Sequence, residues 1–193
     1  NQKIAGRSLS ILFVVVVLGA PFVVKPLTWL GNSANGESAS NVLQNIGSLG
    51  SRLIIWNFVV QKIEKKPYLG WGMNASRNLP EANIKQSFFK GKQLVHREFN
   101  IPLHPHNQAL QIWFELGFIG ACIVSLFGGV VIWRFSAQVY RPHLLPVMYA
   151  FIVSILIFDL LSFGIWQNWW LATQFFSLTL LLLMGETKEP KSE

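Results

Sequence analysis

Two histidines and an asparagine stand just ahead of a long apolar stretch, in the run Pro102-Leu103-His104-Pro105-His106-Asn107. Proline is favoured in the first turn of a helix, so we expect Pro105 to open one and to place His106 and Asn107 in its first turn. The positive end of the helix dipole disfavours a charged imidazolium. His106 should therefore stay neutral and be able to accept a proton.

The segment that leads to these histidines is strongly basic. Between Gly31 and Pro105 it holds nine Lys and Arg residues against four Glu residues. An anionic substrate would account for this excess, and so would anionic lipid headgroups at a membrane surface. Arginine is the stronger candidate for phosphate, because its guanidinium is a planar, permanently charged fork that matches phosphate oxygens.

The elements that position these residues must lie in a membrane. The chain has 51% hydrophobic and only 13% charged residues, which is far more apolar than a soluble domain. A helix needs roughly 20 apolar residues to cross a bilayer, and inside lipid helices satisfy their own backbone groups. The pattern predicts an all-α, polytopic membrane helix bundle of four spans. The spans run near Leu9–Leu30, Ala109–Trp133, Leu144–Ile165 and Trp166–Met184.

This division gives a transmembrane segment over 1–30, a loop domain over 31–105, a helix over 106–135, a short loop over 136–143, two helices over 144–185 and a tail over 186–193. Basic residues in short loops mark the cytoplasmic side of a membrane protein. The long loop then faces the other side of the membrane. The residues that set this orientation are Lys3, Arg7, Arg134, Arg141, Lys188 and Lys191.

The first span has an alternative interpretation. Its basic start and apolar centre also fit a secretory signal, with a cleavage zone around Ala34 and Ala39. The chain begins at Asn1 rather than at an initiator Met, which favours a span cut from a longer protein. Cys122, the single cysteine, lies in a predicted span and is expected to be a small packing residue.

The long loop contains an irregular connection, a helix and a turn-rich segment. Gly31–Gly47 is rich in Asn, Ser and Gly and predicts the connection. Ser48–Lys66 has apolar residues at helical spacing and is stopped by Pro67, which predicts an amphipathic helix lying against the membrane or the bundle. Pro67–Gly72 is turn-rich, and Asn74-Ala75-Ser76 fits the weak three-residue pattern of a glycosylation acceptor.

Three motifs follow one another along the chain. They read S-R-x-x-x-W from Ser51, P-Y-L-G-W-G over 67–72, and H-P-H-N-Q-A-L-Q-I-W-F-E-L-G-F-I-G from His104. Each is weak alone, but the ordered set, on a loop between two spans, resembles the C-terminal signature of the O-antigen ligase and polymerase superfamily. The resemblance covers roughly Ser51 to Val130 and implies further spans and another arginine upstream of this fragment.

The resemblance implies a glycosyltransferase that needs no metal and no other cofactor. It would move a glycan from undecaprenyl pyrophosphate to a hydroxyl of the lipid A core or of a growing polysaccharide, at the periplasmic face of the bacterial inner membrane. Arg52 would bind the donor pyrophosphate, and His106 would activate the acceptor. The other expected substrate-binding residues are Asn107, His104, Arg77, Arg97 and Trp56. Membrane lipids are the remaining expected partners, and no nucleic acid is expected.

Other functions stay open beside this one. A polysaccharide polymerase and a protein O-oligosaccharyltransferase share the donor chemistry. From another class, a transporter or permease module could use Asp159 and Glu115 as ion or solute ligands, because ionisable residues inside spans are functional candidates. Asp159 could equally make a structural hydrogen bond to a neighbouring helix.

The candidate site residues also have simpler interpretations. Arg52 could pair with Glu64 or with a lipid phosphate. His104 and His106 could cap a helix or share a metal, although no carboxylate or thiolate ligand is evident nearby.

Two patterns concern packing. The polar stripe His104, Gln108, Gln111 and Glu115 should face protein or a hydrated cavity, with Glu115 holding the glutamines or lining a substrate channel. The small residues Gly117, Ala121, Ser125 and Gly129 predict a close helix–helix contact. Trp166, Trp169 and Trp170 are expected to form an aromatic belt with no catalytic role.

Overall fold

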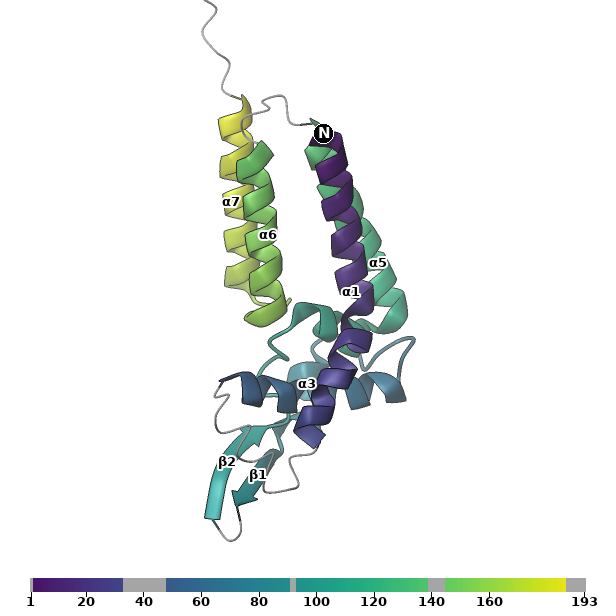
Figure 1. The fold of residues 1–193 in the computed structure, drawn as a ribbon, viewed down its shortest axis with the longest axis vertical. Coiled ribbons are helices and arrows are strands. Elements are labelled where there is room, and N and C mark those ends of the chain that lie inside the picture. The colour runs from purple at the N-terminus through teal and green to yellow at the C-terminus, as the bar shows by residue number, and fades with distance from the viewer. Residues whose placement is uncertain (1, 33–47, 91–92, 139–144, 187–193) are drawn as a thin grey trace, which may run out of the picture.

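Four long helices run side by side in the structure, a computed structural model that describes residues 2–32, 48–90, 93–138 and 145–186 (Figure 1). Successive long helices alternate in direction, and the start of the first lies at the same end as the close of the last (Figure 1). These helices are α1 (Gln2–Asn32), α5 (Gln108–Gln138), α6 (Leu145–Leu161) and α7 (Asn168–Glu186).

The remaining elements gather at the opposite end of the bundle, which we call the polar end (Figure 1). Helix α3 lies across the base of the bundle, and a two-stranded hairpin extends away from it (Figure 1). These elements are α3 (Ser48–Lys65), α4 (Ala75–Asn78), the 3-10 helix η2 (Pro80–Asn83), β1 (Lys85–Lys90) and β2 (Gln93–Phe99).

Two helices are long and apolar enough to cross a membrane, over Ile4–Leu27 and Gln108–Arg134. Helix α6 is also apolar, but its 17 residues are fewer than the roughly 20 that cross a bilayer. Large apolar side chains point outward from the bundle, among them Phe22, Phe127 and Phe175, as expected where the surroundings are lipid. The helical class is thus confirmed, whereas the count of four spans stays a prediction.

Helices α1 and α5 pack closely through small residues. The Ser10 hydroxyl on α1 donates to the Gly129 carbonyl on α5 at 2.6 Å. A Cβ atom added at Gly128 would lie 2.3 Å from the Phe13 ring. Ala121 and Ser125 are fully buried. The predicted small-residue contact is therefore confirmed for the second half of α5.

Gly117 has a different role from the small residues in the second half of α5. Its backbone, with φ 66° and ψ −168°, is not helical and divides α5 at a kink. The Pro67–Gly72 loop docks there by backbone hydrogen bonds, from Trp71 N–H to the Phe114 carbonyl at 2.9 Å and from Phe118 N–H to the Pro67 carbonyl at 2.8 Å. A Cβ atom on Gly117 would lie 2.3 Å from the Tyr68 carbonyl oxygen. The prediction that Gly117 belongs to a helix–helix contact is wrong, because this glycine admits a loop.

Helix α3 forms as predicted and ends one residue earlier, at Lys65. Its residues Leu53, Trp56, Val60 and Ile63 are buried and pack in one cluster with α1 and α5. At its exposed surface Glu64 pairs with Lys25 of α1. The alternative in which Arg52 pairs with Glu64 is therefore wrong.

The hairpin was not predicted. Strands β1 and β2 pair antiparallel, with Lys85 opposite Phe99 and Ser87 opposite Arg97, and the register shifts at Phe88/Phe89. The side chain of Arg97 lies outside what the structure describes. The same holds for residues 33–47 of the predicted connection Gly31–Gly47, with Ala34 and Ala39, for Arg141, and for the tail with Lys188 and Lys191. Gly31 itself belongs to α1.

Candidate active site

His106 lies just before α5 in a strained backbone conformation. Its φ of 55° falls in the left-handed region, which residues other than glycine adopt uncommonly. The helix begins at Gln108, and the Asn107 side chain accepts a hydrogen bond from Leu110 N–H at 3.0 Å. The prediction that Pro105 opens the helix is wrong, because Asn107 is a strong N-cap and leaves His106 outside the first turn.

The imidazole of His106 is oriented by a backbone carbonyl. Its Nδ1 lies 2.9 Å from the Ser162 carbonyl oxygen. A carbonyl only accepts hydrogen bonds, so Nδ1 must carry the hydrogen. In the neutral ring Nε2 then holds a free lone pair, the arrangement needed in a general base.

His104 supports this arrangement. Its ring is buried, and its Nδ1 accepts the backbone N–H of His106 at 3.2 Å. The two rings lie with their centroids 4.3 Å apart. Burial, with smaller contributions from His106 and Arg77, lowers the pKa of His104 from 6.5 to about 4. His104 is thus a neutral acceptor that holds the backbone of His106.

Helix α3 is joined to the same segment by Trp56. The Trp56 indole N–H donates to the Pro105 carbonyl at 2.8 Å. Arg52 lies one helical turn before Trp56, so it belongs to the same face of α3. Arg52 forms no ion pair with any residue in the described part of the chain.

Glu115 joins the elements around the site. It is 1% exposed, and its two oxygens accept hydrogen bonds from the loop before α4, from α4, from α5 and from the α6–α7 connection. The donors are Asn74 N–H, Ser76 N–H and hydroxyl, Gln111 amide and Trp166 indole. The expectation that Glu115 holds a glutamine is confirmed.

The connection between α6 and α7 covers the site. Its Ile165 N–H donates to the Gln111 side chain at 3.1 Å. A Cβ atom at Gly164 would lie 2.9 Å from His104, so a larger residue would push the two segments apart. With Ser162 against His106, this connection completes the site from a part of the chain that the motifs do not include.

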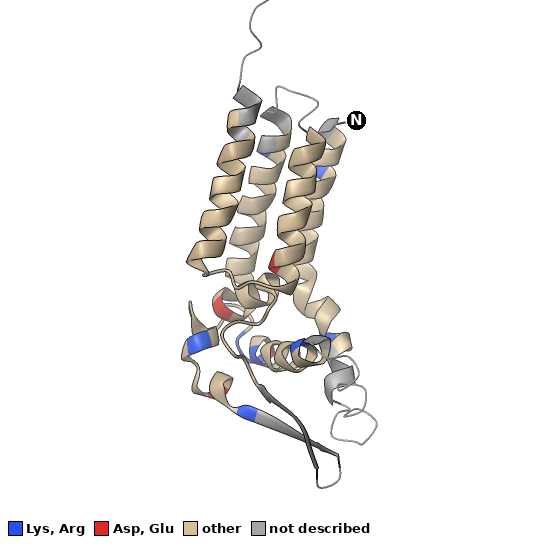
Figure 2. Ribbon diagram, turned by 90° about the vertical axis from the view of Figure 1, so that its left-hand side faces the viewer, with Lys and Arg blue, Asp and Glu red and all other residues tan. Residues whose placement is uncertain are grey.

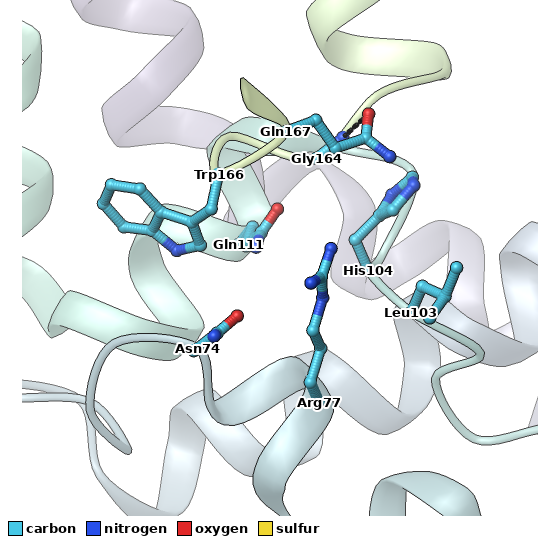
Figure 3. A pocket seen from close by; sticks show the side chains of 8 residues that line it. All are labelled: Asn74, Arg77, Leu103, His104, Gln111, Gly164, Trp166 and Gln167. Atoms are coloured by element: carbon cyan, nitrogen blue, oxygen red, sulfur yellow. Dashed lines mark hydrogen bonds between the residues drawn. The ribbon is translucent and has the colours of Figure 1, made fainter. Parts of the chain in front are cut away.

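Arg77 extends from α4 toward the space between Gln111 and His104 (Figure 3). An adjoining open cleft of about 410 Å³ is lined by Met73, Asn74, Arg77, Trp166 and Asn168. Lys and Arg residues are frequent around α3 and α4, at the polar end of the bundle (Figure 2). The site can therefore offer a base and several cations to one anionic substrate.

Comparison with known proteins decides the family. The model of the family described as O-antigen ligase matches residues 2–125, which include α1, α3, the Pro67–Gly72 loop and the His106 segment. The chain belongs to the O-antigen ligase family.

Several curated relatives of the chain come from Rickettsia species. A protein of Rickettsia conorii is 31% identical over 140 residues, and one of Rickettsia bellii is 33% identical; both are provisionally named polysaccharide ligases. Each alignment covers 71% of this chain and 32% of the relative, so the chain spans about a third of these proteins. No solved structure matches. The family and the apolar helices together make this a membrane protein.

The structure of this O-antigen ligase family chain gives several predicted site residues a structural contact. Asn107 caps α5, Trp56 holds Pro105, and His104 holds the backbone of His106. His106, His104 and Arg77 lie together, and α3 brings Arg52 to the same end of the bundle. In the described residues no three His, Cys, Asp or Glu side chains come close enough to hold a metal ion.

Trp166, Asn74 and the α6–α7 connection were missed as parts of the site. The Trp cluster carried a signal of interfacial position only, and the Asn74 pattern pointed to glycosylation. Asn74 instead adopts a left-handed backbone conformation with φ 64°. The polar stripe was the one signal that led toward Gln111 and Glu115.

Asp159 makes structural hydrogen bonds. Its Oδ1 accepts from Gln108 on α5 at 2.8 Å, from Trp170 at 2.7 Å and from Gln174 at 3.2 Å. Like Glu115, it connects helices through neutral donors. Both carboxylates named for the transporter alternative thus already serve in packing.

Proposed function

We propose that this chain forms the acceptor-activating part of a polysaccharide ligase that moves a glycan from undecaprenyl pyrophosphate to an acceptor hydroxyl. The acceptor would belong to the lipid A core or to a growing polysaccharide, and the site would face the periplasm from the bacterial inner membrane. The contact between His106 Nδ1 and the Ser162 carbonyl carries this proposal, because it leaves Nε2 available as a base.

The reaction would proceed by inversion at the sugar. The acceptor oxygen attacks the anomeric carbon, and its proton passes to Nε2 of His106. The bond between the anomeric carbon and the pyrophosphate oxygen breaks, and both of its electrons leave with undecaprenyl pyrophosphate. The imidazolium then returns its proton to water.

Arg52 would bind the leaving pyrophosphate. Negative charge grows on that group as the bond breaks, and one well-placed donor can lower the barrier by about 3–4 kcal/mol. A general base contributes about 10²–10⁴-fold. Two observations support the role of Arg52: its tie through Trp56 to the His106 segment, and a guanidinium with no ion-pair partner among the described residues.

The test is glycan transfer by the full-length protein in membranes, with His106→Asn and Arg52→Ala. Asparagine tolerates the left-handed conformation better than most residues, so His106→Asn keeps the backbone and removes the base. We expect a loss of about 100-fold or more in each variant. The exposed Gln61→Ala on α3 is the control. Normal transfer by both variants would disprove the proposed roles.

A further inference from the structure

The open cleft beside His104 has the composition of a saccharide site. It combines one aromatic side chain, Trp166, with one cation, Arg77, and two amides, Asn74 and Asn168. A pyranose ring presents C–H groups that pack on an aromatic ring, and hydroxyls that bond to amides. The cleft of about 410 Å³ has room for one sugar ring.

The aromatic side chain is held in place. The Trp166 indole donates to Glu115, and the same carboxylate accepts the N–H of Asn74 at 2.8 Å. Two walls of the cleft are thus fixed to one buried group. A site fixed before binding loses less conformational freedom when its ligand arrives.

The cation in the cleft has no carboxylate partner. Arg77 is exposed and forms no ion pair within the described ranges, whereas Lys25 and Lys62 both do. No acidic side chain lines the cleft. A saccharide that carries a phosphate or a carboxylate would supply the missing charge.

The cleft is built from other segments than the proposed pyrophosphate site. Its lining comes from residues 73–77 and 166–168, while Arg52 belongs to α3. His104 contacts the ring of His106, and it also lines a pocket together with Arg77 (Figure 3). A sugar in the cleft would therefore be held by other elements than the one proposed to hold the donor pyrophosphate.

We infer that this cleft binds an acidic sugar residue of the acceptor, with Trp166 against the ring and Arg77 on its phosphate or carboxylate. The inference rests on the proposed function, since an acceptor exists only if the protein transfers a glycan. It adds the charge of the acceptor and the residues that select it.

The experiment measures transfer kinetics of the full-length protein with its acceptor glycolipid in three forms: untreated, dephosphorylated and carboxyl-reduced. For the wild-type protein, removal of one kind of acidic group should raise the acceptor KM by about 10-fold, the effect of one charge-assisted contact. Arg77→Ala should show the raised KM with all three forms, and Arg77→Lys should recover part of the loss. The donor KM and kcat should change less than about 3-fold, well below that effect.

Trp166 is tested by two substitutions. Trp166→Phe keeps a ring but loses the hydrogen bond to Glu115, and Trp166→Ala loses both. We expect the acceptor KM to rise in the order wild type, Phe, Ala. The inference is overturned if neither dephosphorylation nor carboxyl reduction of the acceptor changes the acceptor KM of the wild-type protein. It is also overturned if these treatments change the acceptor KM of Arg77→Ala as much as that of the wild type. In that case His106→Asn still tests the proposed function on its own.

Discussion

At the scale of single residues, the site depends on hydrogen bonds that fix one proton position. His106 donates from Nδ1 to Ser162, and His104 accepts from the backbone of His106. Neither contact requires a charged ring. The proposed chemistry therefore depends on tautomer control rather than on an unusual residue.

The low pKa of His104 predicts a pH-dependent stability. The folded protein keeps His104 neutral down to pH about 4, whereas an ordinary histidine binds a proton near 6.5. The unfolded state thus holds more protons between these values, and stability falls as the pH drops from 6.5 to about 4. Below that range both states are protonated and the loss is complete.

The substitution His104→Asn tests this dependence. An asparagine can accept the N–H two residues later without titrating. We expect a flatter dependence of the thermal midpoint between pH 6.5 and 4 than in the wild type. Intrinsic fluorescence of the eight tryptophans would report it in detergent. Parallel curves for the two proteins would contradict the assignment.

Glu115→Gln should destabilise the protein. Five donors point at the two oxygens of Glu115, and an amide group would replace one oxygen by a further donor. Leaving buried donors unsatisfied costs about 1–3 kcal/mol each. Thermal unfolding of the full-length protein measures the effect. Glu64→Gln, which removes one exposed carboxylate paired with Lys25, is the control and should change stability little.

At the scale of elements, the decisive contact is the Pro67–Gly72 loop against the kink of α5. Gly72 N–H donates to the Glu115 carbonyl and Ile119 N–H to the Tyr68 carbonyl. Two backbones approach so closely that both Gly70 and Gly117 must lack a side chain. Gly70 of the P-Y-L-G-W-G motif and Gly117 of the motif that starts at His104 thus allow the same close approach of the loop to α5.

Gly117→Ala should disrupt this docking. Its Cβ would lie 2.3 Å from the Tyr68 oxygen, and its φ of 66° is unfavourable for alanine. We expect a loss of about 2 kcal/mol or more and faster proteolysis of the loop. Gly19→Ala on α1, where nothing lies within 4 Å of the added atom, should be neutral or slightly stabilising. Equal behaviour of the two variants would refute the account.

The elements differ in how far the sequence predicts them. Helix α3 was predicted to within one residue, because its apolar spacing and Pro67 are local signals. The kink, the Asn107 cap and the hairpin were not. Gly117 fitted the spacing of a helical stripe, and Pro105 is of a type favoured in a first turn, whereas the structure has a kink at Gly117 and a cap at Asn107. Only contacts between segments distant in the chain decide such cases.

The same limit applies to the site. The motifs led to His106 and Arg52, and the basic loop led to Arg77, but neither led to the Ser162 carbonyl or to Gly164. A backbone carbonyl has no residue type, so no composition or spacing reveals its partner. Trp166 was predicted to be interfacial, and its contact with Glu115 emerged only from the fold.

At the scale of the whole molecule, both ends of the described chain lie opposite the candidate site (Figure 1). This arrangement predicts that α3 and the His106 segment face the periplasm, if the short basic loops face the cytoplasm. Impermeant maleimide applied to spheroplasts tests it, in a protein with Cys122→Ala. Leu69→Cys should react at once, since Leu69 is 75% exposed at the polar end.

Arg134→Cys, near the opposite end of α5, should react only after the membrane is opened. Labelling of Arg134→Cys alone in intact spheroplasts would reverse the predicted orientation. Labelling of both positions would exclude it. Labelling of Leu69→Cys in the unfolded protein is the control for the reagent. If the cysteine stays unlabelled there, the reagent is faulty and the site is not shown to be buried.

Near the polar end, hydrogen bonds cross from the α6–α7 pair to the rest through Ser162, Ile165, Trp166 and Asp159. Splaying the two helix pairs at that end would withdraw the carbonyl that sets the His106 proton while leaving every helix intact. A detergent or a thin bilayer that spreads the bundle would therefore abolish the proposed transfer activity well before the helical content declines.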